Sequence, residues 1–481
     1  MAIRTVDVVI VGAGLSGLMA ARLLQRRGLQ VQVLEARSAV GGRMRSTTTH
    51  NGTVVDLGGQ WGGATHHRLS ALVEELGLER FPSHYSGDGV LCWQGARIQA
   101  PLADSRGDTL LFFDPAALNL APGAWESTSR LQRAFLALVG RIDPQRPWRT
   151  ADAERLDRTS VAAWAAAQTD EPLASLPLSW LCRVGGSGGF EPWEASILHL
   201  AWTQAVAPQA ESPEAWLLRG GAGAVAQRLA EQLRAAAPES ILLQAPVRLV
   251  RQDSRGVEVS ADFGPAYRAR AVVVAVPPQQ RLGIRFEPAL PPAHNALLQR
   301  SAMGAMTKIL AVYERAFWRD EGLNGLGISD LHALELTADS SPPEGSPGIL
   351  AGFASGERAA RLMAMDAAQQ QTLIRHELTT LWGPQAANPV ELLVQPWTAE
   401  PWIGGAFTSF PAPGAWTSHG ALAAGEHGGP GPAHQGRVVW AGTEASPRWP
   451  GYFEGALEAA ELAAQAAADW CLTGDQTDRP G

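Results

Sequence analysis

Cysteine and lysine are the scarcest residues of this chain of 481 amino acids. Its three cysteines are odd in number and far apart, so neither a disulfide framework nor a CxxC metal site is expected at Cys92, Cys182 and Cys471. The eleven histidines show no HxxxH or similar ligand spacing, and we therefore predict that no metal is bound. Lysine occurs once, at Lys308, although lysine and arginine together number 39.

Long apolar runs are also missing. No stretch of about 20 uncharged apolar residues occurs, which argues against a transmembrane helix. The N-terminus enters its first strand without a basic segment, an apolar stretch and a cleavage site, so no secretory signal is expected. A net charge of −8 and a pI of about 5.8 argue against a nucleic-acid partner. We expect a cytoplasmic protein without a membrane anchor.

A phosphate-binding pattern opens the chain. Val6 to Val11 is a nearly continuous β-branched run, typical of a parallel strand buried on both faces. Three glycines follow, which permit a tight turn, the approach of a pyrophosphate and close helix packing: Gly12, Gly14 and Gly17. A second strand ends in Glu35, 18 residues after Gly17 and near the spacing of about 20 at which an acid reaches a ribose hydroxyl. The pattern predicts a dinucleotide-binding fold.

A second glycine pair, in Gly41-Gly42-Arg43, follows this pattern, and its arginine can approach the same pyrophosphate. The alternative for Arg43 is a surface side chain in a flexible loop. With G-A-G-L-S-G, E-A-R and G-G-R in this order, the opening resembles that of the flavin-containing amine oxidases. The resemblance covers nearly the whole chain, and A-G-T-E and W-P-G-Y-F-E-G-A support it near the C-terminus. It implies FAD rather than NAD as the cofactor.

The fold implied by this resemblance is α/β, with a Rossmann-like FAD-binding domain of the GR2 type that an α+β substrate-binding domain interrupts. We assign residues 1–82, 215–300 and 395–472 to the FAD-binding domain, 83–214 and 301–394 to the substrate-binding domain, and 473–481 to a polar tail. The strands expected over 247–250, 257–259 and 271–276 should complete the sheet begun at the N-terminus. Helices are expected over 129–139 and 160–167, and a loop over 425–436.

Residues that contact FAD are also implied by the resemblance. Beside the residues named above, they are Leu15, Ser16, Ala36, Arg37, Gly42, Gly59, Gln60, Trp61, Val247, Trp397, Gly442, Glu444, Tyr452 and Phe453. Ala406 stands where the covalent members carry the cysteine that bonds the flavin, so FAD is expected to be held noncovalently. The helix that starts near Phe453 would direct its N-terminus at the flavin, where it stabilises the anion formed on reduction.

The single lysine lies in M-T-K-I-L-A-V-Y, a strand pattern with two apolar faces. A buried lysine is costly without a partner and its pKa shifts readily, which makes Lys308 a functional candidate. The alternative is a lysine that extends its amine to solvent from a strand end. In the amine oxidases a lysine in a similar strand holds a water against the flavin atom that accepts hydride, and the resemblance assigns this catalytic role to Lys308.

Aromatic residues are expected around the substrate. The resemblance places Phe407 and Tyr452 on either side of the substrate amine as an aromatic cage, because aromatic faces attract a cation and can orient an amine lone pair. Core packing is the alternative for each ring. Trp61 and Trp202 are expected to line the substrate cavity as well, although the stretch from Gly186 to Trp202 matches the family only loosely.

These expectations combine into an FAD-dependent amine oxidase. The amine gives a hydride from its α-carbon to the flavin, the imine is hydrolysed to an aldehyde, and dioxygen reoxidises the flavin to give hydrogen peroxide. A polyamine oxidase and a flavin-dependent desaturase are alternatives. An L-amino acid oxidase is a further alternative. Such an enzyme needs a guanidinium to bind the substrate carboxylate, and Arg448 near the cage keeps this alternative open. The expected partners are a small amine and dioxygen; the identity of the amine and the oligomeric state stay open, with a homodimer as one candidate.

Overall fold

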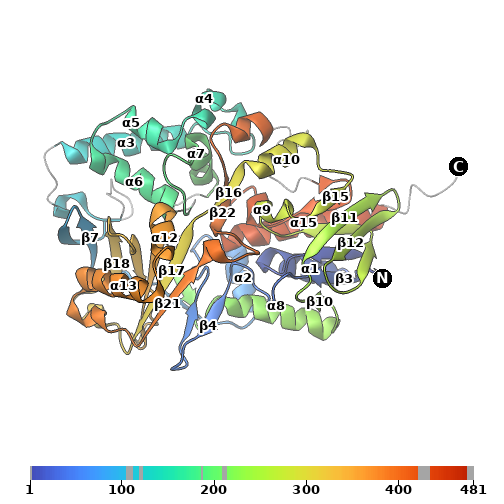
Figure 1. Ribbon diagram of the computed structural model, residues 1–481, viewed down its shortest axis with the longest axis horizontal. Helices are drawn as coiled ribbons and strands as arrows, with labels where there is room; N and C mark the ends of the chain where they lie inside the picture. Colours follow the sequence, from blue (N-terminus) through green and yellow to red (C-terminus); the bar gives the residue numbers. More distant parts are fainter. Residues whose placement is uncertain are drawn as a thin grey trace.

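The structure is a computed structural model that describes residues 3–103, 112–118, 123–185, 188–207, 214–420 and 434–473. A six-stranded sheet occupies one end of the molecule and a seven-stranded sheet the other (Figure 1). The phosphate-binding pattern belongs to the first sheet and the strand of Lys308 to the second. The functional site therefore has to be sought where these two halves meet.

The six-stranded sheet is built on the β-branched runs of the sequence. Its order is β10-β3-β2-β14-β24-β23, and all neighbours are parallel except β23 and β24. The strands are β2 (Val8–Val11), β3 (Val31–Leu34), β10 (Ile241–Leu242), β14 (Ala271–Val274), β23 (His434–Gln435) and β24 (Val438–Trp440). Every residue of β2, β3, β14 and β24 is buried, as expected for parallel strands covered on both faces.

Helices cover one face of this sheet, namely α1 (Leu15–Arg26), α8 (Gly223–Ala236) and α15 (Phe453–Thr473). The other face packs against a five-stranded sheet of order β1-β13-β12-β11-β15. Its strands are β1 (Ile3–Thr5), β11 (Val247–Asp253), β12 (Gly256–Ala261), β13 (Ala266–Ala269) and β15 (Arg285–Glu287). The prediction that 247–250 and 257–259 complete the first sheet was wrong, because β11 and β12 form an antiparallel hairpin in this second sheet. Buried residues of β11 are separated by partly or fully exposed ones, which suits a sheet with one covered face.

The seven-stranded sheet has the order β21-β17-β20-β19-β18-β7-β8. Its strands are β7 (Asp88–Trp93), β8 (Ala96–Pro101), β17 (Met306–Tyr313), β18 (Leu323–Ser329), β19 (Leu336–Asp339), β20 (Gly348–Ser355) and β21 (Glu391–Pro396). Helices α12 (Gly356–Met363) and α13 (Ala367–Trp382) pack on one face. All eight residues of β17 are buried between β20 and β21, so Lys308 lies inside the sheet.

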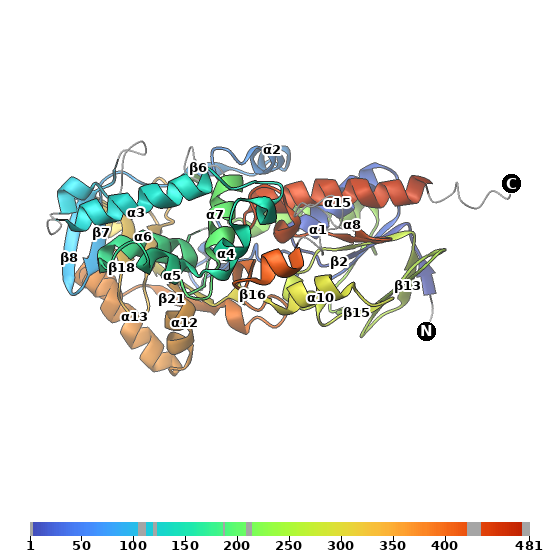
Figure 2. The same ribbon diagram turned by 90° about the horizontal axis from the view of Figure 1, so that it is seen from above.

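A helical layer lies over the half with the seven-stranded sheet, while α15 runs along the other half (Figure 2). It consists of α3 (Ala124–Val139), α4 (Ala153–Arg158), α5 (Val161–Ala166), α6 (Pro172–Arg183) and α7 (Ile197–Val206), which share a core of their own. The helix predicted over 129–139 begins five residues earlier. The one predicted over 160–167 corresponds to α5, with Ser160 as its N-cap, whose Oγ accepts from Ala163 N.

The remaining elements are pairs of short strands and short helices. The pairs are β4 (Ser46–Thr48) with β5 (Val54–Asp56), β6 (Arg80–Pro82) with β9 (Trp216–Leu218), and β16 (Ser301–Gly304) with β22 (Ala406–Pro411). The helices are α2 (His67–Glu75), α9 (Pro278–Arg281), α10 (Pro292–Gln299) and α11 (Phe317–Asp320). Of the loop predicted over 425–436, residues 434–435 form β23 and those before 434 lie outside the described residues. Within the described ranges, no helix is long and apolar enough to cross a membrane.

Candidate functional site

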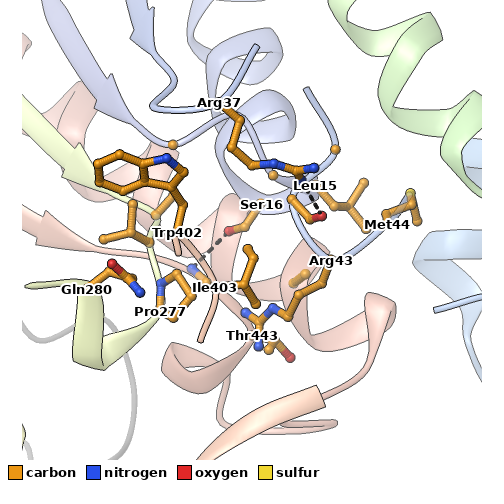
Figure 3. Close-up of a pocket in the computed structure, with 18 of the residues that line it drawn as sticks. Leu15, Ser16, Arg37, Arg43, Met44, Pro277, Gln280, Trp402, Ile403 and Thr443 are labelled. Carbon is orange, nitrogen blue, oxygen red and sulfur yellow. Dashed lines mark hydrogen bonds between the residues drawn. The ribbon is translucent and has the colours of Figure 1, made fainter. Parts of the chain in front are cut away.

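A cavity lies at the carboxyl ends of β2, β3 and β14, with about 1420 Å³ of empty space that includes its opening to solvent. Ligands of open parallel sheets bind at this edge. Trp402, Gln280 and Pro277 lie on one side of the cavity and Leu15 and Met44 on the other (Figure 3). Its lining runs from the glycine turn and Glu35 to Lys308, Phe353 and Tyr452, so an extended ligand in it would contact both halves of the molecule.

The three glycines of the opening pattern have different neighbours. A Cβ on Gly17 would lie 2.0 Å from the carbonyl oxygen of Gly12, so only glycine permits this approach of α1 to the turn. Gly12 itself has a φ of 101°, a left-handed backbone that favours glycine. A Cβ on Gly14 would meet nothing within 4 Å, although Gly14 lines the cavity. The turn is therefore open to a ligand at Gly14, which fits a pyrophosphate above the N-terminus of α1.

Glu35 follows β3 at the edge of the cavity and is 6% exposed. Its Oε2 accepts from the backbone N–H of Ala13 at 2.6 Å and its Oε1 from that of Arg37 at 2.9 Å. Burial raises the pKa of the Glu35 carboxyl, although these hydrogen bonds oppose the shift. The carboxylate is thus held in place beside the glycine turn, at the edge of the cavity. Ala36, Arg37, Val247 and Gly42 line the same cavity.

Arg43 is tied to residues far along the chain. It donates to both carboxylate oxygens of Glu444, at 2.6 and 3.1 Å, and to the carbonyl oxygen of Phe407 at 2.5 Å. Burial acts to raise the pKa of Glu444, but the arginine outweighs it and holds that pKa below its ordinary value. Arg43 is therefore part of a fixed ion pair at the cavity wall and does not lie in a flexible loop.

Lys308 is 3% exposed and lines the cavity. Its Nζ donates to the carbonyl oxygen of Gly58 at 2.7 Å and to Gln60 Oε1, and Gln60 donates in turn to Ser340 Oγ. Burial lowers the pKa of the Lys308 amine to about 7, with the carboxylate of Asp56 opposing the shift. The alternative of an amine extended to solvent does not hold for this side chain.

Aromatic rings surround the lysine amine and continue toward the cage residues. The Nζ lies 5.8 Å from the ring centroid of Trp61 and 5.7 Å from that of Phe353. The Phe353 ring is in turn 6.4 Å from that of Phe407. Phe353 lines the cavity and was missed in the sequence, because only the pairing of β20 with β17 places it opposite Lys308.

Tyr452 lines the cavity and packs on two further rings. Its ring centroid is 5.2 Å from that of Trp449 and 5.6 Å from that of His66. His66 is 1% exposed and accepts from Gly63 N through Nδ1 at 2.8 Å, and burial lowers its pKa to about 4. No role was predicted for His66, because a neutral packing histidine has no spacing signature in the sequence. The neutral imidazole therefore packs against the Tyr452 ring as part of an aromatic cluster with Trp449.

The other predicted site residues fall into three groups. Those that line the cavity are Leu15, Ser16, Gly59, Trp397, Ala406, Gly442 and Phe453. Gly17, Gln60, Trp61 and Glu444 contact lining residues from behind. Trp202 lies elsewhere, 3% exposed in the core of the helical layer, where its Nε1 donates to Pro144 O and its ring packs on Trp416.

Arg448, the candidate partner of a substrate carboxylate, is directed toward α15. Its Nε donates to Glu458 Oε1 at 2.9 Å, and its side chain is 61% exposed. Trp202 and Arg448 lie outside the cavity for the same reason. Each side chain finds its hydrogen-bond acceptor on a segment packed beside it, Pro144 O for Trp202 and Glu458 for Arg448.

Comparison with known proteins identifies the family. A family model described as flavin containing amine oxidoreductase matches residues 15–468. An L-amino acid dehydrogenase of Synechocystis sp. is 38% identical over 461 residues, which cover 96% of this chain and 94% of the relative. A probable flavin-containing monoamine oxidase A of Dictyostelium discoideum is 31% identical over 461 residues, with 94% and 95% covered.

Solved structures of amine oxidases have the same fold. Wild-type putrescine oxidase bound to putrescine has a TM-score of 0.85 and 28% identity, with 97% of this chain and 99% of that one covered. Cyclohexylamine oxidase from Brevibacterium oxydans has a TM-score of 0.86 and 30% identity, with 98% and 100% covered. These likenesses confirm the predicted fold class and family. The chain is a flavin-dependent oxidoreductase and belongs to the family of flavin containing amine oxidoreductases.

Proposed function

We propose that the enzyme oxidises an amine at the carbon that bears the nitrogen, with FAD held noncovalently. The observation that carries this proposal is the buried Lys308 amine in the wall of the cavity that begins at the glycine turn, beside the rings of Trp61 and Phe353. When bound, FAD accepts a hydride from the substrate and returns the electrons to dioxygen, which yields hydrogen peroxide. The oxidised amine leaves as an imine, which water hydrolyses to an aldehyde and ammonia, or to an aldehyde and a smaller amine when the substrate is a secondary amine.

The residues present fit FAD. The open turn at Gly14 would hold the pyrophosphate and the fixed carboxylate of Glu35 the ribose hydroxyls. Ala406 lines the cavity and carries no nucleophile, which supports noncovalent binding. The domain assignment made from the sequence is retained here, since the lining residues come from residues 11–59, 245–284 and 397–456 with only Met306, Lys308 and Phe353 outside them.

Lys308 would hold a water molecule and control its proton. Two acceptors, Gly58 O and Gln60 Oε1, fix the amine, and a further hydrogen bond can be made to a water in the cavity. With a pKa of about 7, the amine exchanges a proton readily at neutral pH. Phe407 and Tyr452 would orient the substrate nitrogen, and the apolar wall around them favours the neutral amine over the ammonium ion.

Anaerobic mixing of the enzyme with amines tests the proposal. We expect aromatic or aliphatic amines to bleach the flavin absorbance under nitrogen, and hydrogen peroxide to appear when oxygen is admitted. Lys308→Met should keep FAD bound and slow the bleaching by about 10²-fold or more, a usual contribution of a proton-transferring side chain. A wild-type enzyme whose flavin is reduced by no amine would contradict the proposal, and a Lys308→Met variant of unchanged rate would contradict the role of the lysine.

Oxidation of L-amino acids is the second candidate, favoured by the 38% identity to a protein named L-amino acid dehydrogenase. Arg448, the arginine considered for the substrate carboxylate, is already paired with Glu458, which favours the amine as substrate. The same anaerobic panel separates the two when it includes L-amino acids. Reduction by amino acids alone would favour the second candidate, and reduction of an added dye without peroxide in air would indicate a dehydrogenase.

A further inference from the structure

We propose that Gly188 and Gly189, a turn of the helical layer that follows α6, fix the ring of Phe407 from behind and thereby set the width of amine that the cavity accepts. This inference rests on the proposed function, because it takes Phe407 as one wall of the amine site. It goes beyond that function by assigning a specificity role to a turn that has no place among the cavity-lining residues.

The contact between the turn and the ring is direct. Gly188 has a φ of 55°, and a Cβ built on it would lie 2.2 Å from Cδ2 and 2.8 Å from Cε2 of Phe407. Both distances are far below van der Waals contact, so the Phe407 ring occupies the space that any other side chain would need. Phe407 lines the cavity and Gly188 lies behind the ring. A group added at position 188 must therefore push the ring toward the substrate.

The turn itself cannot recede, because its backbone is bonded on both sides. Gly189 N donates to Arg183 O at 2.6 Å, and Gly189 O accepts from Ala305 N at 2.9 Å. A Cβ on Gly304 would lie 2.1 Å from the oxygen of Gly188, and one on Gly405 would lie 2.5 Å from the oxygen of Gly304. Three glycine backbones from the helical layer, β16 and the start of β22 are thus stacked without intervening side chains.

Buried charges hold the flanks of the turn. Arg183 Nε donates to Glu191 Oε2 at 2.8 Å, and Glu191 Oε1 accepts from Glu357 N at 3.0 Å. Glu191 is 3% exposed, and a Cβ on Gly356 would lie 2.3 Å from its Oε1. The two flanks of the turn are therefore joined to each other by this ion pair, and Glu191 fastens them to the start of α12, the helix that follows β20.

The backbone of Phe407 is fixed as well, since its carbonyl accepts from Arg43. Only the ring can respond to a change at position 188, and the Phe353 ring stands 6.4 Å away on another side. The remaining direction is into the cavity. A methyl group at position 188 should therefore narrow the site and penalise wide amines more than slim ones.

The experiment compares Gly188→Ala with Gly77→Ala. Gly77 has a φ of 65°, and a Cβ there would meet nothing within 4 Å, so this control carries the same backbone strain without a collision. kcat/KM is measured for a linear primary amine and for a ring-bearing amine, with FAD content checked by absorbance. We expect the ratio of kcat/KM for the linear amine to kcat/KM for the ring-bearing amine to rise about tenfold or more in Gly188→Ala. An effect of this size is typical of a pocket that must accommodate one extra methylene group. The ratio should be unchanged in Gly77→Ala.

A double variant tests whether the ring transmits the effect. Gly188→Ala in a Phe407→Ala background should have the same ratio as Phe407→Ala alone, because alanine lacks the Cγ and Cδ2 atoms with which the new methyl group collides. If Gly188→Ala alone fails to fold and the double variant folds, the collision is likewise supported. A ratio in Gly188→Ala equal to that of Gly77→Ala, an added penalty that persists in the double variant, or a double variant that fails to fold would each overturn the inference.

Failure of the proposed function gives a different result. An enzyme that oxidises only amino acids would refute the amine proposal, and the turn is then tested with alanine against phenylalanine as slim and wide substrates. If the wild type turns over nothing, a displacement of the Phe407 ring is followed instead by the visible circular dichroism of the bound flavin. A shift in Gly188→Ala that is absent in Gly77→Ala and in the double variant would still support the turn, and its absence would overturn the inference.

Discussion

Lys308 shows how one side chain acquires its chemistry from the residues around it. The amine is buried in the middle of β17, and its two described acceptors, Gly58 O and Gln60 Oε1, are uncharged. The carboxylate of Asp56 raises the pKa of the amine but does not offset the effect of burial. A guanidinium at this position would stay charged at all relevant pH values, which gives a physical reason for the only lysine of the chain to stand here.

The shifted pKa predicts how stability depends on pH. The pKa of Lys308 falls from 10.5 to about 7 on folding, so between these values the unfolded chain binds more protons and the folded state gains stability as pH rises. The free energy of unfolding of the wild type, relative to Lys308→Met, should increase by up to about 1.4 kcal/mol per pH unit over this window. Denaturant unfolding of both proteins at pH 7, 8.5 and 10, values chosen inside the window, measures it. A difference that does not change with pH would show that the amine is charged in the folded enzyme.

At the scale of elements, the cavity wall is held together by an ion pair and hydrogen bonds between segments that lie far apart in sequence. The loop after β3 carries Arg43, and the turn before α15 carries Glu444 and Thr443. Thr443 Oγ1 accepts from Gly451 N at 2.8 Å and donates to Tyr452 O at 3.0 Å. The pair Arg43–Glu444 and this hydroxyl together hold the start of α15 against the glycine turn.

Breaking the buried pair should weaken both the fold and the cofactor site. Glu444→Gln leaves Arg43 partly buried without its counter-ion, which typically costs about 3–5 kcal/mol for a buried pair. We expect faster loss of FAD and a lower free energy of unfolding, measured by flavin fluorescence in the filtrate and by denaturant titration. The control Glu231→Gln breaks the exposed pair with Arg228 and should cost less than about 1 kcal/mol. Equal losses in the two variants would mean that the buried pair does not hold the site.

At the scale of the whole molecule, the cofactor cavity joins segments from both halves. Its lining includes Gly14 and Glu35 from the opening pattern, Val247 from the second sheet, Lys308 from the seven-stranded sheet and Tyr452 from before α15. A ligand that contacts all of these binds the folded state only. Binding should therefore stabilise the whole enzyme against unfolding.

Removal and return of FAD tests this coupling. Acid precipitation should release the flavin into the supernatant, since Ala406 offers no bond to it. The apoprotein should unfold at a lower temperature, and FAD at 100 times its Kd should restore about 2.7 kcal/mol, measured by thermal unfolding at increasing FAD. Flavin that stays with the precipitated protein would refute noncovalent binding. A melting temperature that does not respond to FAD would refute the coupling.

Local patterns in the sequence were enough for the family, the fold class and the opening strand, turn and helix. The glycines at 12, 14 and 17 and the β-branched runs report contacts within a few residues, and spacing alone expresses such contacts. The apolar faces around Lys308 predicted its burial for the same reason. Resemblance at the two ends of the chain then supplied the flavin, which the comparisons support.

Only the tertiary structure decided which distant residues meet. Arg43 and Glu444 are 401 residues apart, and the turn at Gly188 meets a ring more than 200 residues away. Phe353, His66 and the hairpin of the second sheet were missed, and Trp202 was expected at the cavity although it packs inside the helical layer. Such contacts depend on how whole sheets and layers pack against one another. Periodicity records which face of an element is apolar, but it does not record which other element covers that face.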